Sequence, residues 1–269
     1  MDTNIIAVFS VTAIGVISAA VLCVASKIMY VKSDEALNKM LEGLPGTNCG
    51  ACGFTGCSGY AKALLSDPSV KNDLCTPGGD SVLKMISRIL GVEAGKFTKK
   101  TAIVHCLGDN KAQQKKMDYK GLQSCEAAKR LYGGEGACAF GCLGYGDCLA
   151  VCPDHGICME NSLARINTNC TGCGLCVKAC PNNLITIEDV SLPVFIACNN
   201  IERGALARKK CLRACLGCGK CMRECPEKAI TVEDNLARID HEKCRGCGHC
   251  VDICVAKCMK ERVKVRGKR

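Results

Sequence analysis

The residues with the clearest chemical potential in this sequence are cysteines in closely spaced triplets. The segment "CTGCGLCVKACP" occupies residues 170–181 and nearly recurs as "CLGCGKCMRECP" at 215–226 and "CRGCGHCVDIC" at 244–254. Thiols two residues apart converge on one point, which suits a metal core better than a disulfide framework. Triplets followed by a distal cysteine, usually before proline, are typical of four-iron, four-sulfur (4Fe-4S) cluster ligands. The spacing therefore indicates one-electron transfer chemistry.

The distal cysteine of each motif can bind either the cluster of its own motif or that of the neighbouring motif. In bacterial-type two-cluster ferredoxins, three cysteines of one motif bind one cluster and the distal fourth binds the other. This rule predicts three ligand sets: Cys152 with Cys170, Cys173 and Cys176; Cys254 with Cys215, Cys218 and Cys221; and Cys225 with Cys244, Cys247 and Cys250. The last distal cysteine is followed by valine where the others are followed by proline.

A fourth motif, "CAFGCLGYGDCLAVCP" at residues 138–153, departs from this pattern. Tyr145 stands at the position that corresponds to Cys218 in the regular motif. We expect the upstream Cys138 to supply the missing ligand. The predicted set is Cys138, Cys142, Cys148 and Cys180. The alternative is a three-iron cluster that lacks a ligand at this corner.

A separate group of four cysteines lies nearer the N-terminus. Cys49, Cys52, Cys57 and Cys75 follow a Cys-x2-Cys-x4-Cys-x17-Cys pattern. Four thiolates in one compact unit suit either an iron–sulfur cluster or a zinc site, and spacing alone does not decide between them. With a cluster here, twenty cysteines would bind five 4Fe-4S clusters. The other seven are expected to be small buried side chains, with Cys106 and Cys125 the first candidates for another role: Cys23, Cys106, Cys125, Cys158, Cys198, Cys211 and Cys258.

Composition agrees with this chemistry. The 269 residues include 27 cysteines, an odd number that disfavours a fully paired disulfide protein and indicates a reducing compartment. The formal charge of +10 could suggest nucleic-acid binding, but five clusters of about −2 each would offset it, and no nucleic-acid motif is present. With five Phe, five Tyr and no Trp, we expect folding to depend on the clusters.

The N-terminal part contains an uncharged run, "IIAVFSVTAIGVISAAVLCVAS", from Ile5 to Ser26. Its 22 residues predict a single transmembrane helix. A cleaved signal peptide is the alternative, but Asp2 is the only charged side chain before the run. Lys27 and Lys32 follow it, so we expect the N-terminus outside and the iron–sulfur domains on the cytoplasmic side of the cell membrane.

The elements that must position the cysteines are short. "SVLKMISRILG" predicts a helix capped by Ser81 and stopped by Gly91, and "AIVHC" and "VFIAC" predict buried strands. "NLARIDHEKC" repeats "SLARINTNC" 73 to 74 residues later, which indicates duplicated modules. The prediction is a small α+β multi-domain chain: 1–30 transmembrane anchor, 31–77 four-cysteine 4Fe-4S domain, 78–134 connector, 135–190 ferredoxin module 1, 191–210 connector, and 211–269 ferredoxin module 2 with a basic tail.

The segments "LPGTNCGACGFTGCSGYA" and "GCLGYGDCLAVCP", in this domain order, resemble the B subunit of the Rnf complex, and the resemblance covers the whole chain. It implies a subunit of an ion-translocating ferredoxin:NAD+ oxidoreductase in the cytoplasmic membrane. Such a subunit would accept electrons from soluble ferredoxin and pass them to membrane subunits that carry flavin, the NAD site and the path for Na+ or H+. The chain itself has no Gly-x-Gly-x-x-Gly after a strand and no catalytic constellation.

Two other functions fit the motifs less well. One is an iron–sulfur subunit of a hydrogenase or formate dehydrogenase, which does not account for the Cys49 domain. The other is a structural zinc protein that assembles partners, which does not account for the Cys-Pro endings.

Overall fold

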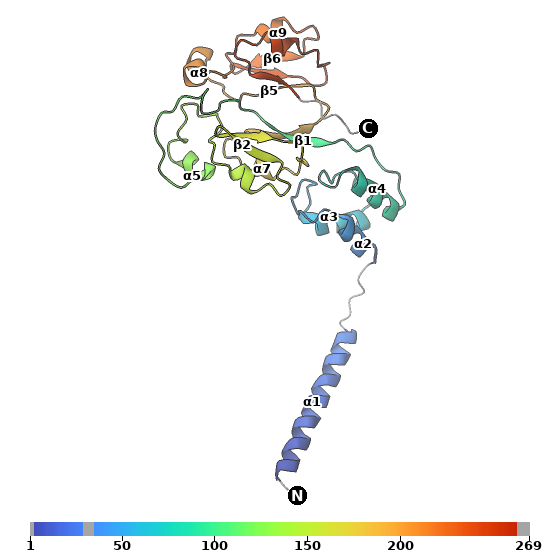
Figure 1. The fold of residues 1–269 in the computed structure, drawn as a ribbon. Coiled ribbons are helices and arrows are strands. Elements are labelled where there is room, and N and C mark those ends of the chain that lie inside the picture. Colours follow the sequence, from blue (N-terminus) through green and yellow to red (C-terminus); the bar gives the residue numbers. More distant parts are fainter. Residues whose placement is uncertain (1–2, 29–34, 263–269) are drawn as a thin grey trace. The chain divides into compact units, whose positions relative to one another are not determined.

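The computed structural model describes residues 3–28 and 35–262, so the basic tail from residue 263 lies outside the described residues. The chain divides into two units, Met1–Lys39 and Met40–Arg269. Figure 1 shows the course of the chain through these units. The second unit contains every cysteine that the sequence motifs single out.

The first unit contains helix α1 (Thr3–Ile28). Within residues 3–28 and 35–262, no helix has the combined length and apolar character needed to cross a membrane. The predicted N-terminal transmembrane helix is therefore wrong.

The four-cysteine domain is helical. Its helices pack around the fully buried side chains of Met40, Tyr60 and Ile86. The Tyr60 hydroxyl donates a hydrogen bond of 2.8 Å to the backbone oxygen of Lys71, which satisfies its one polar atom. The helices are α2 (Glu35–Gly43), α3 (Gly56–Ser66) and α4 (Gly79–Leu90).

Helix α4 tests the sequence prediction for residues 81–91. It ends as predicted, because Gly91 adopts a φ of 67°, a left-handed conformation that stops a helix. Its start differs. The helix begins at Gly79, and the Ser81 hydroxyl donates 3.1 Å to the backbone oxygen of Gly78 without capping an N–H group. The side chains of Val82 and Ile86 are buried in the core.

Module 1, as we call the ferredoxin-like part of residues 99–190, is built from two antiparallel strand pairs. β2 pairs with β3 as a hairpin, and β1 pairs with β4 from much later in the chain. The predicted strand "AIVHC" is β1. Its elements are β1 (Lys100–Val104), α5 (Cys125–Arg130), α6 (Asp147–Ala150), β2 (Ile157–Glu160), β3 (Leu163–Ile166), α7 (Leu175–Ala179) and β4 (Ile185–Asp189).

Module 2, residues 191–262, repeats this arrangement. β6 pairs with β7 as a hairpin, and β5, the predicted strand "VFIAC", pairs with β8. Its elements are β5 (Val194–Ile196), α8 (Gly204–Lys210), α9 (Lys220–Arg223), β6 (Ile230–Glu233), β7 (Leu236–Ile239), α10 (His249–Asp252) and β8 (Met259–Glu261). Thus both predicted connectors contribute an outer strand to a module.

The two hairpins have the same turn chemistry. Asn161 and Ser162 turn the chain between β2 and β3 with φ angles of 50° and 60°, and Asp234 and Asn235 do so between β6 and β7 with 49° and 60°. Positive φ at both central residues gives the two-residue turn whose twist matches that of the paired strands. Each turn leads into the sequence "LARI", so the repeat seen in the sequence is a repeated hairpin.

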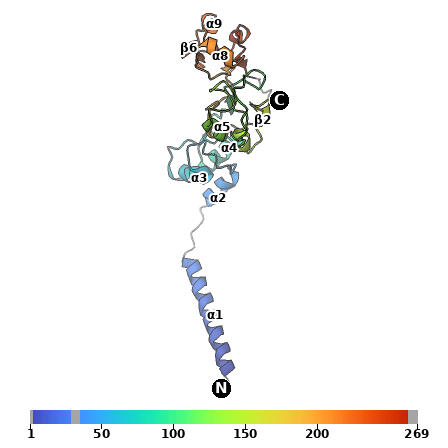
Figure 2. The same ribbon diagram turned by 90° about the vertical axis from the view of Figure 1, so that its left-hand side faces the viewer.

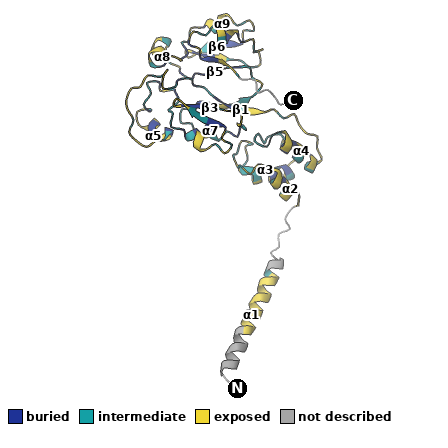
Figure 3. Ribbon diagram, viewed as in Figure 1, coloured by how far each residue is buried: buried dark blue, intermediate teal, exposed yellow. Residues whose placement is uncertain are grey.

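The cores of the modules are poor in large side chains. In both, the buried residues are mainly alanine, cysteine and single aliphatic side chains such as Leu163 and Val194. Figure 3 shows the buried residues concentrated along the hairpins. Within residues 40–262, module 1 lies between the α3–α4 segment and module 2, as the turned view in Figure 2 also shows.

Candidate iron–sulfur sites

Each ferredoxin-type motif folds into the same local structure. A glycine with positive φ ends the first part of the motif, and a helix of four or five residues begins directly after it. Gly174 and Gly248, for example, both have a φ of 78°. The third cysteine of the motif lies in this short helix. This turn aims backbone N–H groups and closely spaced sulfurs at one side.

Three of the predicted ligand sets surround small cavities. In each set the distal cysteine of one motif meets the triplet of the other, as the two-cluster rule requires. The cavity linings include Cys152, Cys170, Cys173 and Cys176 in module 1, and in module 2 Cys215, Cys218, Cys221 and Cys254 at one cavity and Cys225, Cys244, Cys247 and Cys250 at another. Four thiols around an enclosed space are the donor set of a 4Fe-4S cluster.

The electrostatics of these cavities favour a bound cationic core. Burial, together with neighbouring thiols, raises the pKa of Cys176 to about 12 and that of Cys250 to about 11. A bare thiolate is therefore disfavoured at these positions at neutral pH. Iron removes this penalty, because it supplies the positive charge that replaces the thiol protons.

The N-terminal four-cysteine group also converges. Burial raises the pKa of Cys75 to about 11, and the nearby Cys57, Cys52 and Cys49 thiols add to the effect, so the other three cysteines of the group lie in the neighbourhood of Cys75. Asn48 orders the loop, because its side-chain oxygen accepts the Cys57 N–H at 2.8 Å.

This four-cysteine group lies against module 1. Burial raises the pKa of Cys173, and the nearby Cys49 and Cys152 thiols add to the effect. The Lys178 ammonium donates a hydrogen bond of 3.4 Å to the backbone oxygen of Cys49. The Cys49 group therefore adjoins the cavity of Cys173.

The irregular motif has a different arrangement from the predicted one. Cys142, Cys148 and Cys180 line a fourth cavity, and the cysteine that joins them is Cys125. Burial and the nearby Cys142, Cys125 and Cys180 thiols raise the pKa of Cys148 to about 12. Cys138 does not line this cavity. Its sulfur instead accepts a hydrogen bond from the side chain of Asn200 at 3.3 Å.

The sequence analysis named Cys125 as a candidate for another role but did not assign it to this set, because it lies 17 residues before Cys142, outside any motif. One signal was present: Tyr145 leaves a ligand position open. The ring of Tyr145 packs edge-on against Tyr119, with centroids 5.7 Å apart. Cys125, at the start of α5, lines the same cavity as the other thiols of this set.

Asp147 positions Cys125. Its carboxylate accepts the backbone N–H groups of Cys125 at 2.9 Å and Glu126 at 3.1 Å and the hydroxyl of Ser124 at 2.9 Å. Partial burial opposes ionisation, but these hydrogen bonds prevail and lower the pKa of Asp147 below its ordinary 3.8. The charged side chain thus holds the first turn of α5 over the cavity.

We expect Asp147→Asn to lower the stability of the holoprotein by about 1–2 kcal/mol at neutral pH, since the amide cannot replace a charged acceptor of three hydrogen bonds. Because the folded pKa is depressed, the contribution is complete above the ordinary aspartate pKa and is lost as pH falls through the folded value. Chemical denaturation of the variant, beside Asp252→Asn at an exposed position, measures the effect. Equal stability of the two variants would contradict this role.

Module 2 has a fifth thiol at one cavity. The sulfur of Cys258 lies 3.6 Å from that of Cys254, and its hydrogen bonds lower the pKa of Cys254 to about 5 and that of Cys215 to about 6. A thiol donor beside ligand sulfurs stabilises negative charge on them. The sequence alone assigned Cys258 no such position.

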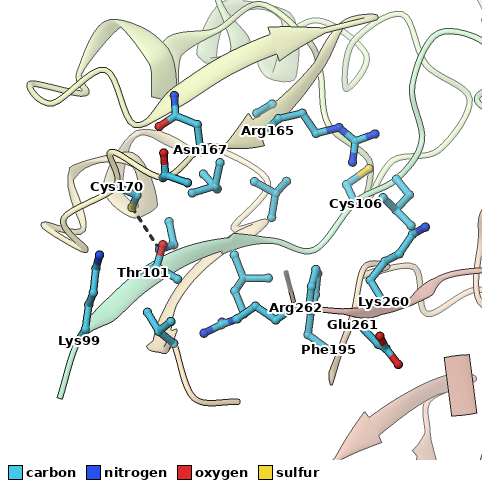
Figure 4. Close-up of a pocket in the computed structure, with 18 residues that line it drawn as sticks. Lys99, Thr101, Cys106, Arg165, Asn167, Cys170, Phe195, Lys260, Glu261 and Arg262 are labelled. Atoms are coloured by element: carbon cyan, nitrogen blue, oxygen red, sulfur yellow. Dashed lines mark hydrogen bonds between the residues drawn. The ribbon is translucent and has the colours of Figure 1, made fainter. Parts of the chain in front are cut away.

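A larger cavity, of about 810 Å³, runs along β1. Figure 4 shows Cys170 and Cys106 on opposite sides of it, with the basic side chain of Lys99 at the edge on the Cys170 side and that of Arg165 near Cys106. The Cys170 sulfur accepts the Ala102 N–H at 3.4 Å, which ties β1 to the ligand set of Cys170. With two well-separated cysteines, this cavity is not a cluster site.

The described residues contain no group of three or more His, Cys, Asp or Glu side chains close enough to share a single metal ion. The cysteines of the four cavities instead surround spaces that suit a polynuclear core. All 27 cysteines are free thiols.

Fold and sites together define a multicluster, ferredoxin-type iron–sulfur electron-transfer protein. Family models agree with this class. A model for an Fe-S cluster domain matches residues 44–77, and two models for 4Fe-4S dicluster domains match residues 169–230 and 208–255.

Curated relatives specify the family. The chain is 38% identical over 247 residues to the B subunit of the Na(+)-translocating ferredoxin:NAD(+) oxidoreductase complex of Acetobacterium woodii, covering 91% of this chain and 74% of the relative. It is 39% identical over 260 residues to the proton-translocating counterpart of Clostridium ljungdahlii, covering 96% and 91%. The B subunit of the ion-translocating oxidoreductase complex of Methanosarcina acetivorans is 37% identical over 139 residues, 52% of each chain. The chain belongs to the family of Rnf complex B subunits.

Proposed function

We propose that this chain is the subunit of an Rnf-type complex that accepts single electrons from reduced ferredoxin. It then delivers these electrons to partner subunits. Its relatives are named as subunits of ferredoxin:NAD(+) oxidoreductase complexes. The observation that carries the proposal is the succession of cysteine groups within residues 40–262, in which the N-terminal group adjoins module 1 and the two sets within each module adjoin each other. Such a series suits transport of electrons and offers no site for transformation of an organic substrate.

Cysteines of different ligand sets lie close together at three places, which supports electron transfer between the sets. Cys49 adjoins Cys173, which links the N-terminal group to module 1. Within module 1, burial raises the pKa of Cys148, and the nearby Cys176 thiol raises it further. Within module 2, Cys221 has the same effect on Cys250. In each case the two thiols belong to different ligand sets, so neighbouring sets share a border.

Five 4Fe-4S clusters, each of which accepts and returns one electron, suit the five sets. The cysteines fix and enclose these centres, and nearby N–H groups donate to their sulfurs. For the N-terminal set we retain Cys49, Cys52, Cys57 and Cys75, and for the irregular set we propose Cys125, Cys142, Cys148 and Cys180. Cys125 replaces Cys138 because it shares the cavity with the other three.

Replacement of Cys125 tests that assignment. We expect Cys125→Ser to lose about four irons per chain, or to convert this centre to a three-iron cluster with its distinct paramagnetic spectrum. The matched control is Cys158→Ser, since the Cys158 thiol donates to the Arg165 backbone oxygen at 3.8 Å and faces no cluster cavity. Iron analysis and electron paramagnetic resonance compare the two. A full iron complement and an unchanged spectrum in Cys125→Ser would show that another residue, not Cys125, is the fourth ligand of this cluster.

The partners follow from what the chain lacks. We found no dinucleotide-binding motif in the sequence, so the NAD site, the flavins and the ion path belong to other subunits. One relative is named for Na+ and the other for protons, so the coupled ion is one of these two. We place the iron–sulfur domains on the cytoplasmic side of the cell membrane, because free thiols and clusters require a reducing compartment.

Rapid mixing of the anaerobically purified chain with reduced ferredoxin tests the function. We expect bleaching of the iron–sulfur absorbance in this chain as ferredoxin is oxidised, one electron for each centre reduced. Chain stripped of iron is the control and should leave ferredoxin reduced. A colourless zinc protein, or a brown protein that ferredoxin cannot reduce, would refute the proposal.

A further inference from the structure

Four cysteines that belong to none of the five sets gather where the two modules meet. They come from four separate segments, and each is buried, with 6–8% of its surface exposed. Two follow the outer strands β1 and β5, and two precede the first cysteine of a ferredoxin-type motif by four residues. They are Cys106, Cys198, Cys138 and Cys211.

Their sulfurs are close together. A methyl group placed on Gly108 would lie 3.1 Å from the Cys211 sulfur and 3.7 Å from the Cys106 sulfur, so one small site borders both. Cys138 is near the other three. Burial raises the pKa values of the other three cysteines, and in each case the Cys138 thiol raises the value further.

All four sulfurs accept backbone hydrogen bonds in the same manner. In each case one donor is the N–H of the residue two positions later. The four donors are Gly108, Phe140, Asn200 and Arg213. Such N–H groups stabilise ligand thiolates, whereas a thiol that only fills space has no charge for them to stabilise. Cys158, outside every group, shows the contrast, because its thiol acts as a donor.

The group has an internal two-fold character. Each module supplies one cysteine after its outer strand and one at the start of a Cys-x3-Cys segment, "CAFGC" or "CLRAC". His105 joins the two halves. Its Nδ1 lies 2.7 Å from the backbone oxygen of Ile196, so this nitrogen donates and fixes the end of β1 beside that of β5.

Both halves also touch a cluster ligand. The Cys106 sulfur accepts the N–H of Cys142 at 3.3 Å, and the Cys198 sulfur accepts the N–H of Cys215 at 3.3 Å. Cys142 belongs to the irregular set of module 1, and Cys215 belongs to a set of module 2. The four-cysteine group thus occupies the only break, among the described residues, in the succession of adjacent sets.

We propose that Cys106, Cys138, Cys198 and Cys211 bind a sixth iron–sulfur cluster, which connects the clusters of module 1 to those of module 2. This inference rests on the proposed electron-transfer function. The exchange involves one electron, lost by a centre of one module and gained by a centre of the other, with no bond made or broken. The buried amide of Asn200, which donates to Cys138 and is 1% exposed, completes the polar shell.

A cluster fits better than a single zinc ion. The described residues contain no group of three or more His, Cys, Asp or Glu side chains that could hold a single metal ion. The Cys-x3-Cys spacing also differs from the pairs of Cys-x2-Cys that zinc sites commonly use.

The test uses the full chain, assembled and purified without oxygen. Native mass spectrometry and iron analysis should give about 24 irons for the wild type and about 20 for Cys138→Ala/Cys211→Ala. The matched control, Cys23→Ala/Cys158→Ala, also removes two thiols and should retain the wild-type value. In the first variant, ferredoxin should still reduce module 1 at the wild-type rate, whereas the spectrum of module 2 should respond more slowly.

Each outcome is decisive. A wild-type mass that accommodates only five clusters overturns the inference, and so does zinc that the first variant alone loses. The number of clusters in the wild-type protein is measured without any substitution. A variant that misfolds therefore does not affect this part of the test. If every protein lacks iron, the proposed function fails. If five centres form and accept electrons but no sixth is found, this inference alone fails.

Discussion

Removal of iron and sulfide should unfold both ferredoxin modules. The buried side chains of modules 1 and 2 are mostly alanine and cysteine, and the few large ones, such as Leu163 and Val194, cannot sustain domains of this size. Loss of the clusters also leaves buried thiols around empty cavities. We expect the modules to lose roughly 5 kcal/mol or more, which is most of the stability of a small domain.

Hydrogen exchange of the hairpin amides measures this loss. The amides of β2–β3 and β6–β7 should lose their protection when a chelator removes iron anaerobically, and should regain it on reconstitution. The α3–α4 segment is an internal comparison. It buries Met40, Tyr60 and Ile86 and should retain more protection than the hairpins. Protected hairpins in iron-free protein would mean that the apolar cores are sufficient.

Gly217→Val should abolish the cluster of Cys215, Cys218, Cys221 and Cys254. Gly217 has a φ of 60°, where side chains are strained, and an added Cβ would lie 2.7 Å from the backbone oxygen of Asn235. That oxygen belongs to the β6–β7 turn and cannot move without breaking the hairpin. Strain and overpacking together should cost roughly 2–5 kcal/mol.

The repeat strengthens the argument. Gly144 occupies the same position in the irregular motif, with a φ of 83°, and a Cβ there would lie 2.6 Å from the oxygen of Ser162 in the β2–β3 turn. Both motifs therefore pack a bare backbone against a hairpin turn. Only glycine permits this close approach.

Iron analysis and denaturation measure the effect of Gly217→Val. About four irons per chain should be lost. Gly95→Val is the control, because its nearest neighbour would be an ordinary contact of 3.6 Å with the side chain of Asn72. A Gly217→Val protein with its full iron content would show that the β6–β7 turn can move to accommodate the added side chain.

The corrections have physical causes. Hydropathy alone predicted a membrane-crossing helix over Ile5–Ser26, and the described residues contain none that qualifies. Ser81 resembled a helix cap, but a glycine with positive φ at position 79 lets the helix begin earlier. The spacing to Cys142 favoured Cys138 as the missing ligand. Yet that cysteine lies beside Asn200, and Cys125 takes the place at the cavity.

The chemistry and its local sites follow from the order and spacing of the residues. Cysteines two residues apart are brought together by one glycine turn and one short helix, so spacing predicted three complete ligand sets and the use of iron and sulfide. The Rnf resemblance came from two longer segments and the order of the domains. Only the tertiary structure decided which isolated cysteines meet. Cys125 reaches its cavity because Asp147 holds α5, and Cys106 approaches Cys198 because β1 and β5 pair with distant strands. Contacts of that kind depend on strand pairing across the chain, which residue spacing does not encode.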